Sequence, residues 1–230
     1  MGKISVIIPT RDRPEFLAQA ADSVLQQRFS DIELLIVNDG ALPVADFGDD
    51  RVRVLNNEMR GAVPARNLGI LEASGSYIAF VDDDDYWIDL SHLAQASAAL
   101  SGSSDFYFAN GSMLFPNGET RLFSRGADKQ SLMVDNTILI SSVCYQRDLH
   151  FRIGNFDETL PYYWDWDWYL RVAKADFRLA HSDQEAVAIR VHPQNMSGET
   201  NRKDRQENLN LLIAKHSLKN ITLKNHLDFV

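Results

Sequence analysis

The chain has 230 residues, 45% hydrophobic and 24% charged, an ordinary composition for one globular α/β domain with a short appendage. Its formal net charge of −9 argues against a nucleic-acid binder, because such a protein needs a basic face to neutralise phosphates. The single cysteine, Cys144, excludes an intramolecular disulfide and fits a reducing compartment. No apolar run reaches the roughly 20 residues that cross a bilayer, so we expect a cytoplasmic protein.

Strands and helices are predicted to alternate over the first 109 residues. Apolar runs predict strands at residues 3–8, 33–37, 51–55, 77–81 and 106–109. Amphipathic stretches between them predict helices that follow Asp12 and cover residues 64–74 and 90–100. Asp12 followed by Glu15 is a helix-start pattern, and Gly75 is expected to end the second helix. This alternation predicts an α/β fold with a mostly parallel sheet covered by helices on both faces.

The alternation ends after residue 110. Asn117-Gly118 lies between two apolar runs and predicts a β-hairpin, whereas residues 130–160 carry weak periodicity. Helical spacing predicts helices at 165–175 and 201–219, and an apolar run predicts a strand at 186–191. The sequence shows no internal repeat and no sign of a second domain.

Polar side chains follow three predicted strands: Thr10, Asp39 and the four aspartates at residues 82–85. Ligands of open parallel sheets bind beyond the carboxyl ends of the strands, where these side chains are expected. Two carboxylates about 4 Å apart repel by roughly 4 kcal/mol at an effective dielectric constant of 20, and a bound cation relieves that repulsion. Mg²⁺ or Mn²⁺ suits such a site, because small hard cations take carboxylates and substrate phosphates as ligands. Helix capping by Asp85 or Asp89 is the simpler interpretation, but four aspartates exceed what capping requires.

Several rival motifs are missing from the sequence. No G-x-G-x-x-G pattern follows the first strand, and there is neither a G-x-x-x-x-G-K-[ST] loop nor a G-x-S-x-G nucleophile elbow. A sugar nucleotidylyltransferase shares the layout and the metal. It is expected to carry a glycine-rich loop after the first strand, where this chain has PTRDR at residues 9–13. That difference weakens the alternative and leaves it open.

Three of the four tryptophans surround two carboxylates: Trp164, Trp166 and Trp168 alternate with Asp165 and Asp167. Aromatic faces suit the apolar faces of sugar rings, and burial beside them raises a carboxylate's pKa towards general-base strength. The alternative is that Asp165 caps a helix and the tryptophans belong to the core. Three tryptophans in five residues are more than one core-facing stripe needs, so the pattern favours a sugar site.

Seven short motifs follow one another in the order SVIIPT (5–10), VNDG (37–40), ARNLG (65–69), FVDDDD (80–85), GNFDE (154–158), DWDWYLR (165–171) and RVH (190–192). Together they make the chain resemble the inverting glycosyltransferases of family 2, which have the GT-A fold. The resemblance runs from Ile4 to about residue 197. It implies a GT-A domain at 1–198, with a nucleotide-sugar-binding half at 1–109, an acceptor-side half at 110–198, and a C-terminal helical extension at 199–230.

The resemblance implies roles for individual residues of the donor site. Thr10 and Asp39 match positions that hold the base and ribose of a nucleotide sugar, and Arg66 lies in the stretch that lines the same pocket. Asp82 matches the first acid of the family's D-x-D motif, and we expect both Asp82 and Asp83 beside the donor. Asp83 is an extra acid in the middle of that motif, and Ala41 replaces the serine common after the Asp-Gly pair.

The resemblance also implies a metal site and a catalytic base. Asp84, the second acid of the D-x-D motif, is the expected direct ligand of Mn²⁺ or Mg²⁺, together with Asp82 and His192. Asp165 matches the catalytic aspartate. Trp164 replaces the glutamate that usually precedes it, so Asp167 stays open as a second choice.

The implied activity is metal-dependent, inverting transfer of a sugar from a nucleotide-diphosphate sugar to an acceptor hydroxyl. We expect a UDP-linked donor and a saccharide or glycoconjugate acceptor, in polysaccharide or glycoconjugate biosynthesis. A sugar nucleotidylyltransferase and a non-catalytic nucleotide-sugar-binding protein are the alternatives. Cations at residues 202–224 also allow docking to the inner face of a membrane, although Asp204 and Glu207 between them favour a solvated helix.

Overall fold

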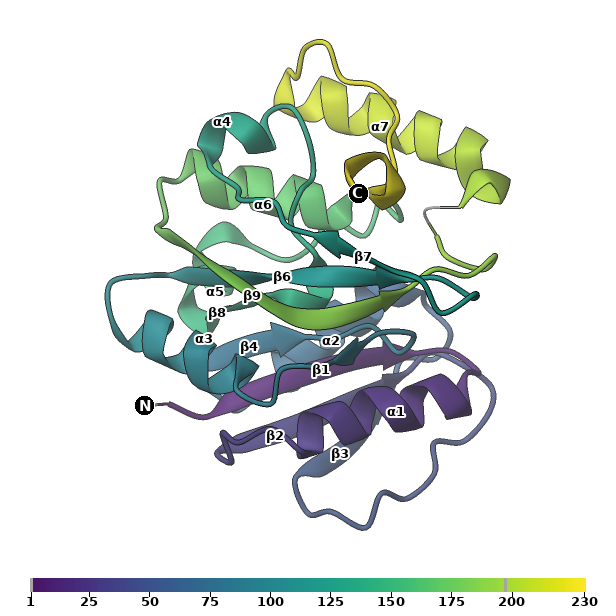
Figure 1. Ribbon diagram of the computed structural model, residues 1–230, viewed down its shortest axis with the longest axis vertical. Helices are drawn as coiled ribbons and strands as arrows, with labels where there is room; N and C mark the ends of the chain where they lie inside the picture. Colours follow the sequence, from purple (N-terminus) through teal and green to yellow (C-terminus); the bar gives the residue numbers. More distant parts are fainter. Residues whose placement is uncertain (1, 197) are drawn as a thin grey trace.

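The computed structural model describes residues 2–196 and 198–230, without the side chains at 199 and 226. Ser197, where the family resemblance ends, lies outside the described residues. Within the described chain, nine strands form one sheet in the order β3-β2-β1-β4-β8-β6-β9-β5, with β7 paired to β6 (Figure 1). The strands are β1 (Ile4–Thr10), β2 (Ile32–Asn38), β3 (Val52–Asn56), β4 (Tyr77–Phe80), β5 (Tyr86–Trp87), β6 (Phe106–Leu114), β7 (Thr120–Phe123), β8 (Cys144–Gln146) and β9 (Leu179–Arg190).

Helices cover both faces of this sheet. They are α1 (Pro14–Leu25), α2 (Ala62–Glu72), α3 (His92–Ser101), α4 (Lys129–Leu132), α5 (Arg147–Ile153), α6 (Trp164–Lys174) and α7 (Arg202–His216), with short 3-10 turns η1 (Ile140–Ser142), η2 (Glu199–Asn201) and η3 (His226–Phe229). Strands β1 to β4 pair in parallel, whereas β8 runs antiparallel to β4 and β6. The predicted α/β class and mostly parallel sheet are confirmed.

Burial on both faces explains why β1 is an unbroken apolar run. Val6 and Ile8 belong to the core that contains residues of α1 and α3, whereas Ile7 belongs to the core that contains residues of α2, α5 and α6. A strand with helices on both sides has no solvent face, so its sequence shows no alternation. The carboxyl ends of β1 and β2 are in register, with Thr10 opposite Asn38.

Two predicted helix ends have different chemistry from that expected. Helix α1 begins where the pattern predicted, but its N-cap is Arg13 without a side-chain bond, and Asp12 Oδ1 instead accepts from the backbone N–H of Leu42 at 2.8 Å. Helix α2 ends before Ala73, so Gly75 is not its C-cap. An added Cβ at Gly75 would lie 2.6 Å from the carbonyl oxygen of Lys3, so close packing explains this glycine.

Strands β6 and β9 are longer than the apolar runs that predicted them. Their pairing continues through a bulge at Asn110, whose side-chain amide donates to the carbonyl of Asp183 at 3.0 Å. Ser112 donates to the carboxylate of Glu185 across the same pair of strands. Satisfied polar side chains therefore extend the sheet where hydrophobicity alone marks no strand. The predicted hairpin at Asn117-Gly118 is confirmed as the β6–β7 connection.

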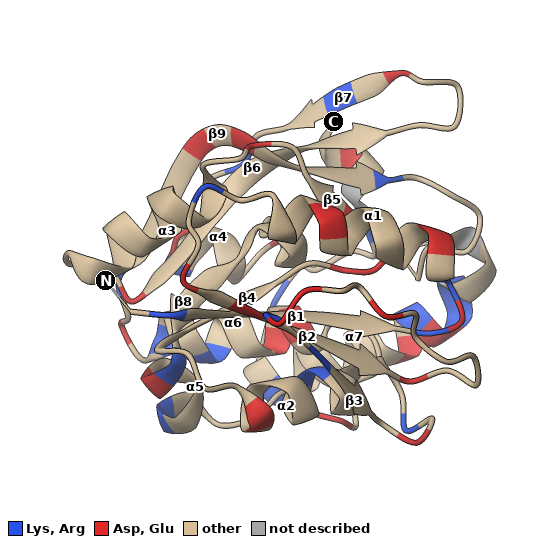
Figure 2. Cartoon of the chain, turned by 90° about the horizontal axis from the view of Figure 1, so that it is seen from below, with Lys and Arg blue, Asp and Glu red and all other residues tan. Residues whose placement is uncertain are grey.

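Charge is mixed over the outside of the molecule. Lys and Arg lie among Asp and Glu across the elements seen in Figure 2. No helix in the described residues is long and apolar enough to cross a membrane. The four consecutive aspartates at residues 82–85, in contrast, line a cavity.

Candidate active site

A cavity of about 670 Å³ opens at the carboxyl ends of β1, β2 and β4 and extends beneath α6 and α7. It brings together the predicted site residues apart from Asp167: Thr10, Asp39, Arg66, Asp82, Asp83, Asp84, Asp165 and His192 all line it. These side chains come from six separate stretches of sequence. The motifs name these residues, and the strand order of the folded chain brings them together in one cavity.

Asp39 lines the cavity directly after β2 and is held by several hydrogen bonds. Its side chain is buried, and Oδ1 accepts from Asn57 Nδ2 at 2.6 Å and from the backbone N–H of Gly61 at 3.0 Å. Its own backbone N–H donates to the carbonyl of Thr10 at 2.8 Å. Oδ2 has no hydrogen-bond donor among the described residues, so it can accept from a ligand N–H or O–H.

Arg66 is a buried cation of the cavity wall. Its guanidinium pairs with Asp82 Oδ1 and donates to the carbonyl of Ala62 at 3.0 Å. The same group lies 4.4 Å from the ring centroid of Trp164, a cation–π distance. Trp164, which replaces the expected glutamate, therefore packs its ring against the guanidinium of Arg66.

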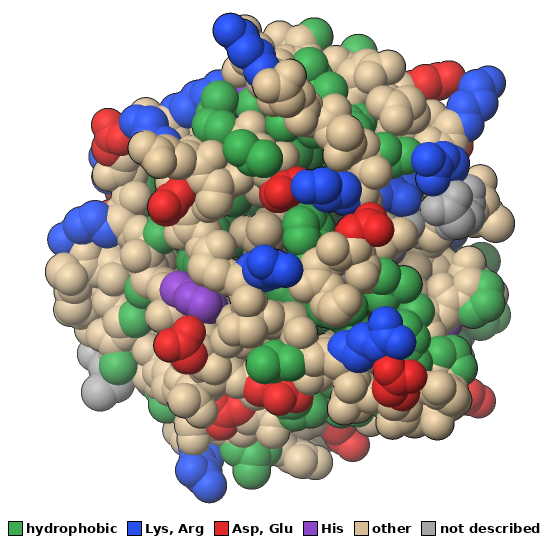
Figure 3. Space-filling view, turned by 45° about the horizontal axis from the view of Figure 1, so that its top comes forward, with side chains coloured by type: hydrophobic (Ala, Val, Ile, Leu, Met, Phe, Trp, Pro, Cys, Tyr) green, Lys and Arg blue, Asp and Glu red, His purple; other side chains and the backbone are tan. Residues whose placement is uncertain are grey.

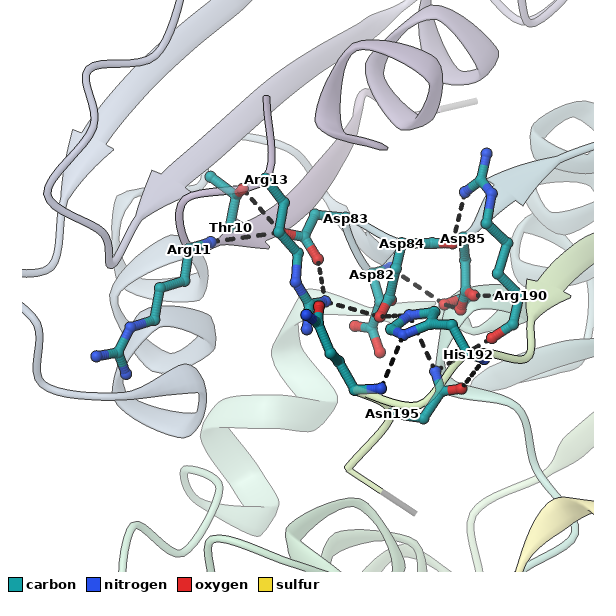
Figure 4. Close-up of polar contacts among 12 residues, drawn as sticks. Thr10, Arg11, Arg13, Asp82, Asp83, Asp84, Asp85, Arg190, His192 and Asn195 are labelled. Carbon is teal, nitrogen blue, oxygen red and sulfur yellow. Dashed lines mark hydrogen bonds and ion pairs between the residues drawn. The ribbon is translucent and has the colours of Figure 1, made fainter. Parts of the chain in front are cut away.

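Asp83 points back towards β1, away from the other acids (Figure 4). Its Oδ2 accepts from Thr10 Oγ1 at 2.8 Å, and Oδ1 lies 3.2 Å from Arg13 Nη1. Burial, followed by repulsion from Asp84, raises the pKa of Asp83 to about 6 from its ordinary 3.8, although the Thr10 hydrogen bond lowers it. Asp83 and Thr10 thus act as one hydrogen-bonded unit at the end of β1.

Asp84 lies between Arg13 and His192. Its Oδ2 lies 2.8 Å from Arg13 Nη1 and 3.0 Å from His192 Nε2 (Figure 4). His192 is held in turn by Asn195, whose Oδ1 accepts from the His192 backbone N–H at 2.6 Å. Asp84 and His192, both expected as metal ligands, are therefore in direct contact.

Asp85 belongs to this acid cluster and does not cap α3. Its carboxylate accepts from Ser141 Oγ at 2.6 Å and from the backbone N–H of Arg190 at 3.2 Å. Asp89 does not cap α3 either: the N-cap is Ser91, without a side-chain cap bond, and Asp89 Oδ1 accepts from the backbone N–H of Ser91 before the helix begins. Burial, followed by repulsion from Asp84, raises the pKa of Asp85.

The cluster offers the donor set of a divalent-cation site. Oxygen atoms of Asp82, Asp84 and Asp85 lie within 4.8 Å of one another. Carboxylate oxygens at this spacing suit Mg²⁺ or Mn²⁺, which need oxygen ligands and neutralise the repulsion among the acids. The residues present therefore fit the cation expected from the sequence.

Asp165 lies on the opposite wall of the cavity, in the first turn of α6. The N-cap of α6 is Tyr163, so Asp165 is not the cap. Its Oδ2 accepts from Asn136 Nδ2 at 2.8 Å. Burial raises the pKa of Asp165, while the Asn136 hydrogen bond and the charge of Arg66 lower it in part. A half-buried carboxylate with a raised pKa and one fixed oxygen has the properties of a general base.

Asp167 is a structural residue on the far side of the same helix. Its fully buried carboxylate lies 2.7 Å from His216 Nε2, 2.7 Å from Lys215 Nζ and 3.0 Å from Arg171 Nε. His216 and Lys215 join α6 to α7, whereas Arg171 lies in α6 itself. Although burial raises the pKa of Asp167, the hydrogen bonds from His216 and Lys215 outweigh it and leave the pKa below its ordinary value.

The tryptophan cluster belongs mainly to the core, although Trp164 and Trp166 also line the cavity. Trp168 is fully buried, and its ring lies 4.8 Å from Tyr145 and 5.4 Å from His150, measured between centroids. Trp166 is buried and donates to the carbonyl of Leu132 at 2.7 Å. Helix α6 packs between the sheet, α4 and α7 and therefore has more than one buried face. From the sequence we assumed one core-facing stripe and so underestimated how many tryptophans of this helix the core can bury.

Sequence reasoning missed several site residues: Arg13, Asn136, Ser141, Arg190 and Asn195. Arg13 follows the motif at residues 5–10 and Arg190 begins the motif at 190–192, so their place beside recognised motifs was an available signal. Asn136 and Ser141 lie in the weakly periodic stretch at 130–160, where only the folded chain shows their partners.

The family model for glycosyl transferase family 2 matches residues 5–128. The uncharacterized glycosyltransferase YwdF of Bacillus subtilis (strain 168) is 34% identical over 97% of this chain and 87% of its own length. The chain belongs to glycosyl transferase family 2. As a family 2 glycosyltransferase it is an enzyme, and the family predicted from the sequence motifs is confirmed.

Solved structures agree with this assignment at the level of the fold. S. aureus TarS 1–349 in complex with UDP-GlcNAc superposes with a TM-score of 0.72 at 19% identity, over 93% of this chain and 66% of TarS 1–349. The mannosyltransferase PcManGT from Pyrobaculum calidifontis, in complex with GDP-Man and Mn²⁺, gives 0.69 at 16% identity, over 98% of this chain and 67% of its own. The expected GT-A fold of this glycosyltransferase is confirmed.

Proposed function

We propose that this family 2 glycosyltransferase moves a sugar from a nucleotide-diphosphate sugar, UDP-linked, to an acceptor hydroxyl with inversion at the anomeric carbon. One observation carries the proposal. One cavity is lined by Asp39, by the acid run at residues 82–85 and by Asp165, a carboxylate with a raised pKa. Both reacting partners can therefore meet between the acid run and Asp165.

The donor nucleotide is assigned to the part of the cavity that Asp39 lines. Asp39 Oδ2 accepts from the base, and Thr10 and Asp83 form the adjoining wall. Arg66 and Arg13 supply positive charge beside the diphosphate position, which offsets the negative charge of the aspartates. The solved structures with UDP-GlcNAc and GDP-Man lend general support to a nucleotide-sugar donor.

A divalent cation, Mn²⁺ or Mg²⁺, is assigned to Asp84, Asp82 and His192, with Asp85 beside them. When bound, it supplies Lewis-acid stabilisation of the departing diphosphate. Arg66 fixes the orientation of Asp82, and Ser141 fixes that of Asp85. The Mn²⁺ complex of PcManGT is consistent with this choice of ion.

Asp165 is the proposed general base. It takes the proton of the acceptor hydroxyl, whose oxygen forms a bond to the anomeric carbon as the bond from that carbon to the diphosphate oxygen breaks. The electron pair leaves with the nucleotide diphosphate. A single in-line displacement of this kind inverts the anomeric configuration. Asn136 holds one carboxylate oxygen of Asp165, which leaves the other oriented towards the cavity.

The acceptor is proposed to be a saccharide or glycoconjugate, and the reaction to serve polysaccharide or glycoconjugate biosynthesis in the cytoplasm. The acceptor side of the cavity carries aromatic and amide side chains, including Tyr162, Asn225 and Phe229, which suit a sugar ring. Association with the inner face of the membrane and the division of the chain at residues 109 and 198 stay predictions.

The test is release of nucleotide diphosphate from UDP-glucose, UDP-GlcNAc and GDP-mannose with Mn²⁺, with acceptor glycosides added and product configuration read by proton NMR. Release that needs Mn²⁺ and a product of inverted configuration are expected. Pyrophosphate formed from a nucleoside triphosphate and a sugar phosphate would support the nucleotidylyltransferase alternative. Binding of donors without any cleavage or transfer would support the non-catalytic one.

A further inference from the structure

The last ten residues, 221–230, form a segment that closes the acceptor side of the cavity; we call it the closing segment. Five of its residues line the cavity: Thr222, Lys224, Asn225, Leu227 and Phe229. It leaves the end of α7 and turns back beside it, so that the chain ends near β7 (Figure 1). The face that carries α7, turned forward in Figure 3, shows hydrophobic side chains exposed among cations and acids.

The closing segment is anchored at both ends. Arg205, buried in α7, donates to the carbonyl of Lys224, and Arg125 Nη2 donates to the carbonyl of Phe229 at 3.0 Å. The ring of Phe229 packs edge-on against Phe123 of β7, with 6.0 Å between centroids. Asn225 Oδ1 accepts from the backbone N–H of Leu227 at 2.8 Å, which fixes the 3-10 turn between the anchors.

A short path of contacts leads from this segment to the base. Lys224 Nζ lies 2.6 Å from Asp135 Oδ1, and the next residue in the chain is Asn136, which donates to Asp165 Oδ2 at 2.8 Å. The side chains of Lys224 and Asp135 are 37% and 24% exposed, so the pair is only partly screened by solvent. The closing segment is thus one ion pair away from the residue that orients the proposed base.

Asn136 needs such support. Its Oδ1 is buried without a hydrogen-bond partner among the described residues. Burial of an amide oxygen without a partner is unfavourable, so the placement of Asn136 beside Asp165 depends on other contacts of its loop. A constraint from a neighbouring residue is required, and the Lys224–Asp135 pair provides one.

We infer that the closing segment shapes the acceptor side of the cavity and, through Lys224 and Asp135, holds Asn136 against Asp165. Lys224 is then a positioning residue of the transfer reaction. The inference rests on the proposed role of Asp165 as the base. Loss of the pair frees the loop at residues 133–138 and misaligns the carboxylate, while the nucleotide end of the cavity is unaffected.

The test compares Lys224→Met, which keeps the side-chain length, with Lys224→Arg as the conservative rescue and Lys219→Met as a matched control at another exposed lysine. Asp135→Asn breaks the same pair from the other side. Each variant is measured for amide hydrogen exchange at residues 133–138, for UDP affinity by calorimetry with Mn²⁺, and for release of UDP from UDP-glucose. In that last assay water is the acceptor.

We expect Lys224→Met and Asp135→Asn to exchange faster at residues 133–138 and to release UDP about tenfold more slowly or worse, with UDP affinity unchanged. Lys224→Arg and Lys219→Met should match the wild type. Unchanged exchange at 133–138 overturns the inference, and so does faster exchange with undiminished turnover. A wild-type chain that cleaves no UDP-glucose counts against the proposed donor, while the exchange data still decide whether Lys224 holds the loop.

Discussion

Exchange of Asp165 and Asp167 for asparagine, one at a time, should separate catalysis from stability on a single helix. Asp165→Asn removes the proposed base but keeps its shape, so turnover should fall roughly 10²–10⁴-fold. Its folding should not suffer. Because burial raises the pKa of Asp165, the charged form destabilises the fold as the pH rises past its ordinary pKa. The neutral asparagine carries no such cost, so at neutral pH the variant should melt at or above the wild-type temperature.

Asp167→Asn should show the opposite behaviour. The carboxylate is fully buried among His216, Lys215 and Arg171, whose side chains are 4%, 38% and 24% exposed. Breaking a fully buried pair costs about 3–5 kcal/mol, and the partial exposure of two partners reduces this to roughly 2–3 kcal/mol. For a chain of this length that corresponds to a Tm lower by roughly 5–10 °C. Since the pKa of Asp167 is lowered, its stabilisation is present at neutral pH and is lost as the pH falls through that pKa.

The assay is UDP release from UDP-glucose with Mn²⁺, measured well below the Tm of each variant, beside thermal melts at pH 7 and pH 4. UDP affinity by calorimetry serves as the control for an intact donor site. If Asp167→Asn abolishes turnover and Asp165→Asn does not, the base lies two residues along and our assignment of Asp167 to structure is wrong. If neither slows turnover, the base lies elsewhere in the cavity.

Two further predictions concern residues outside α6. Asp39→Ala should weaken UDP binding by about one to two decades, since a charge-assisted hydrogen bond is worth roughly 1.5–3 kcal/mol, and normal affinity in the folded variant would show that Asp39 is structural. Burial raises the pKa of Glu33, but hydrogen bonds from Ser5 and Ser74 outweigh it and lower the pKa to about 2 from its ordinary 4.5. The stability that ionised Glu33 contributes should therefore be lost as the pH falls from about 4.5 towards 2. In Glu33→Gln, the free energy of unfolding should change less over this pH range than in the wild type. An equally steep loss of stability in the variant would contradict the prediction.

The parallel half of the fold was predictable because β1, β2 and β4 are buried on both faces. Runs such as residues 33–37 and 77–81 carry their own signal, and the polar residues after them mark the ligand edge of the sheet. The second half was less accessible to sequence reasoning. Strand β6 continues through Asn110 and Ser112, whose pairing partners lie more than 70 residues away. Hydrophobic patterns do not record such partners.

The residues of the candidate site likewise fall into two groups, those that sequence motifs identify and those whose role depends on contacts in the folded chain. Residues in motifs, such as Asp84 and His192, could be named before the structure, although their direct contact could not. The distinction between Asp165 and Asp167 depended on which side of α6 faces the cavity, and α7, which partners Asp167, is remote in sequence. Asn136 gave no signal at all, because its role depends on contacts with Asp165 that form only in the folded chain.

The most direct test of the central claim is calorimetry of UDP binding with Mn²⁺ and in excess chelator, for the wild type and Asp84→Asn. Oxygens of Asp82, Asp84 and Asp85 lie within 4.8 Å of one another beside the assigned diphosphate position, so a diphosphate should bind only with a cation that offsets their charge. We predict that chelator abolishes measurable UDP binding and that Asp84→Asn with Mn²⁺ resembles the wild type in chelator. Equal UDP affinity with and without divalent metal would contradict the account.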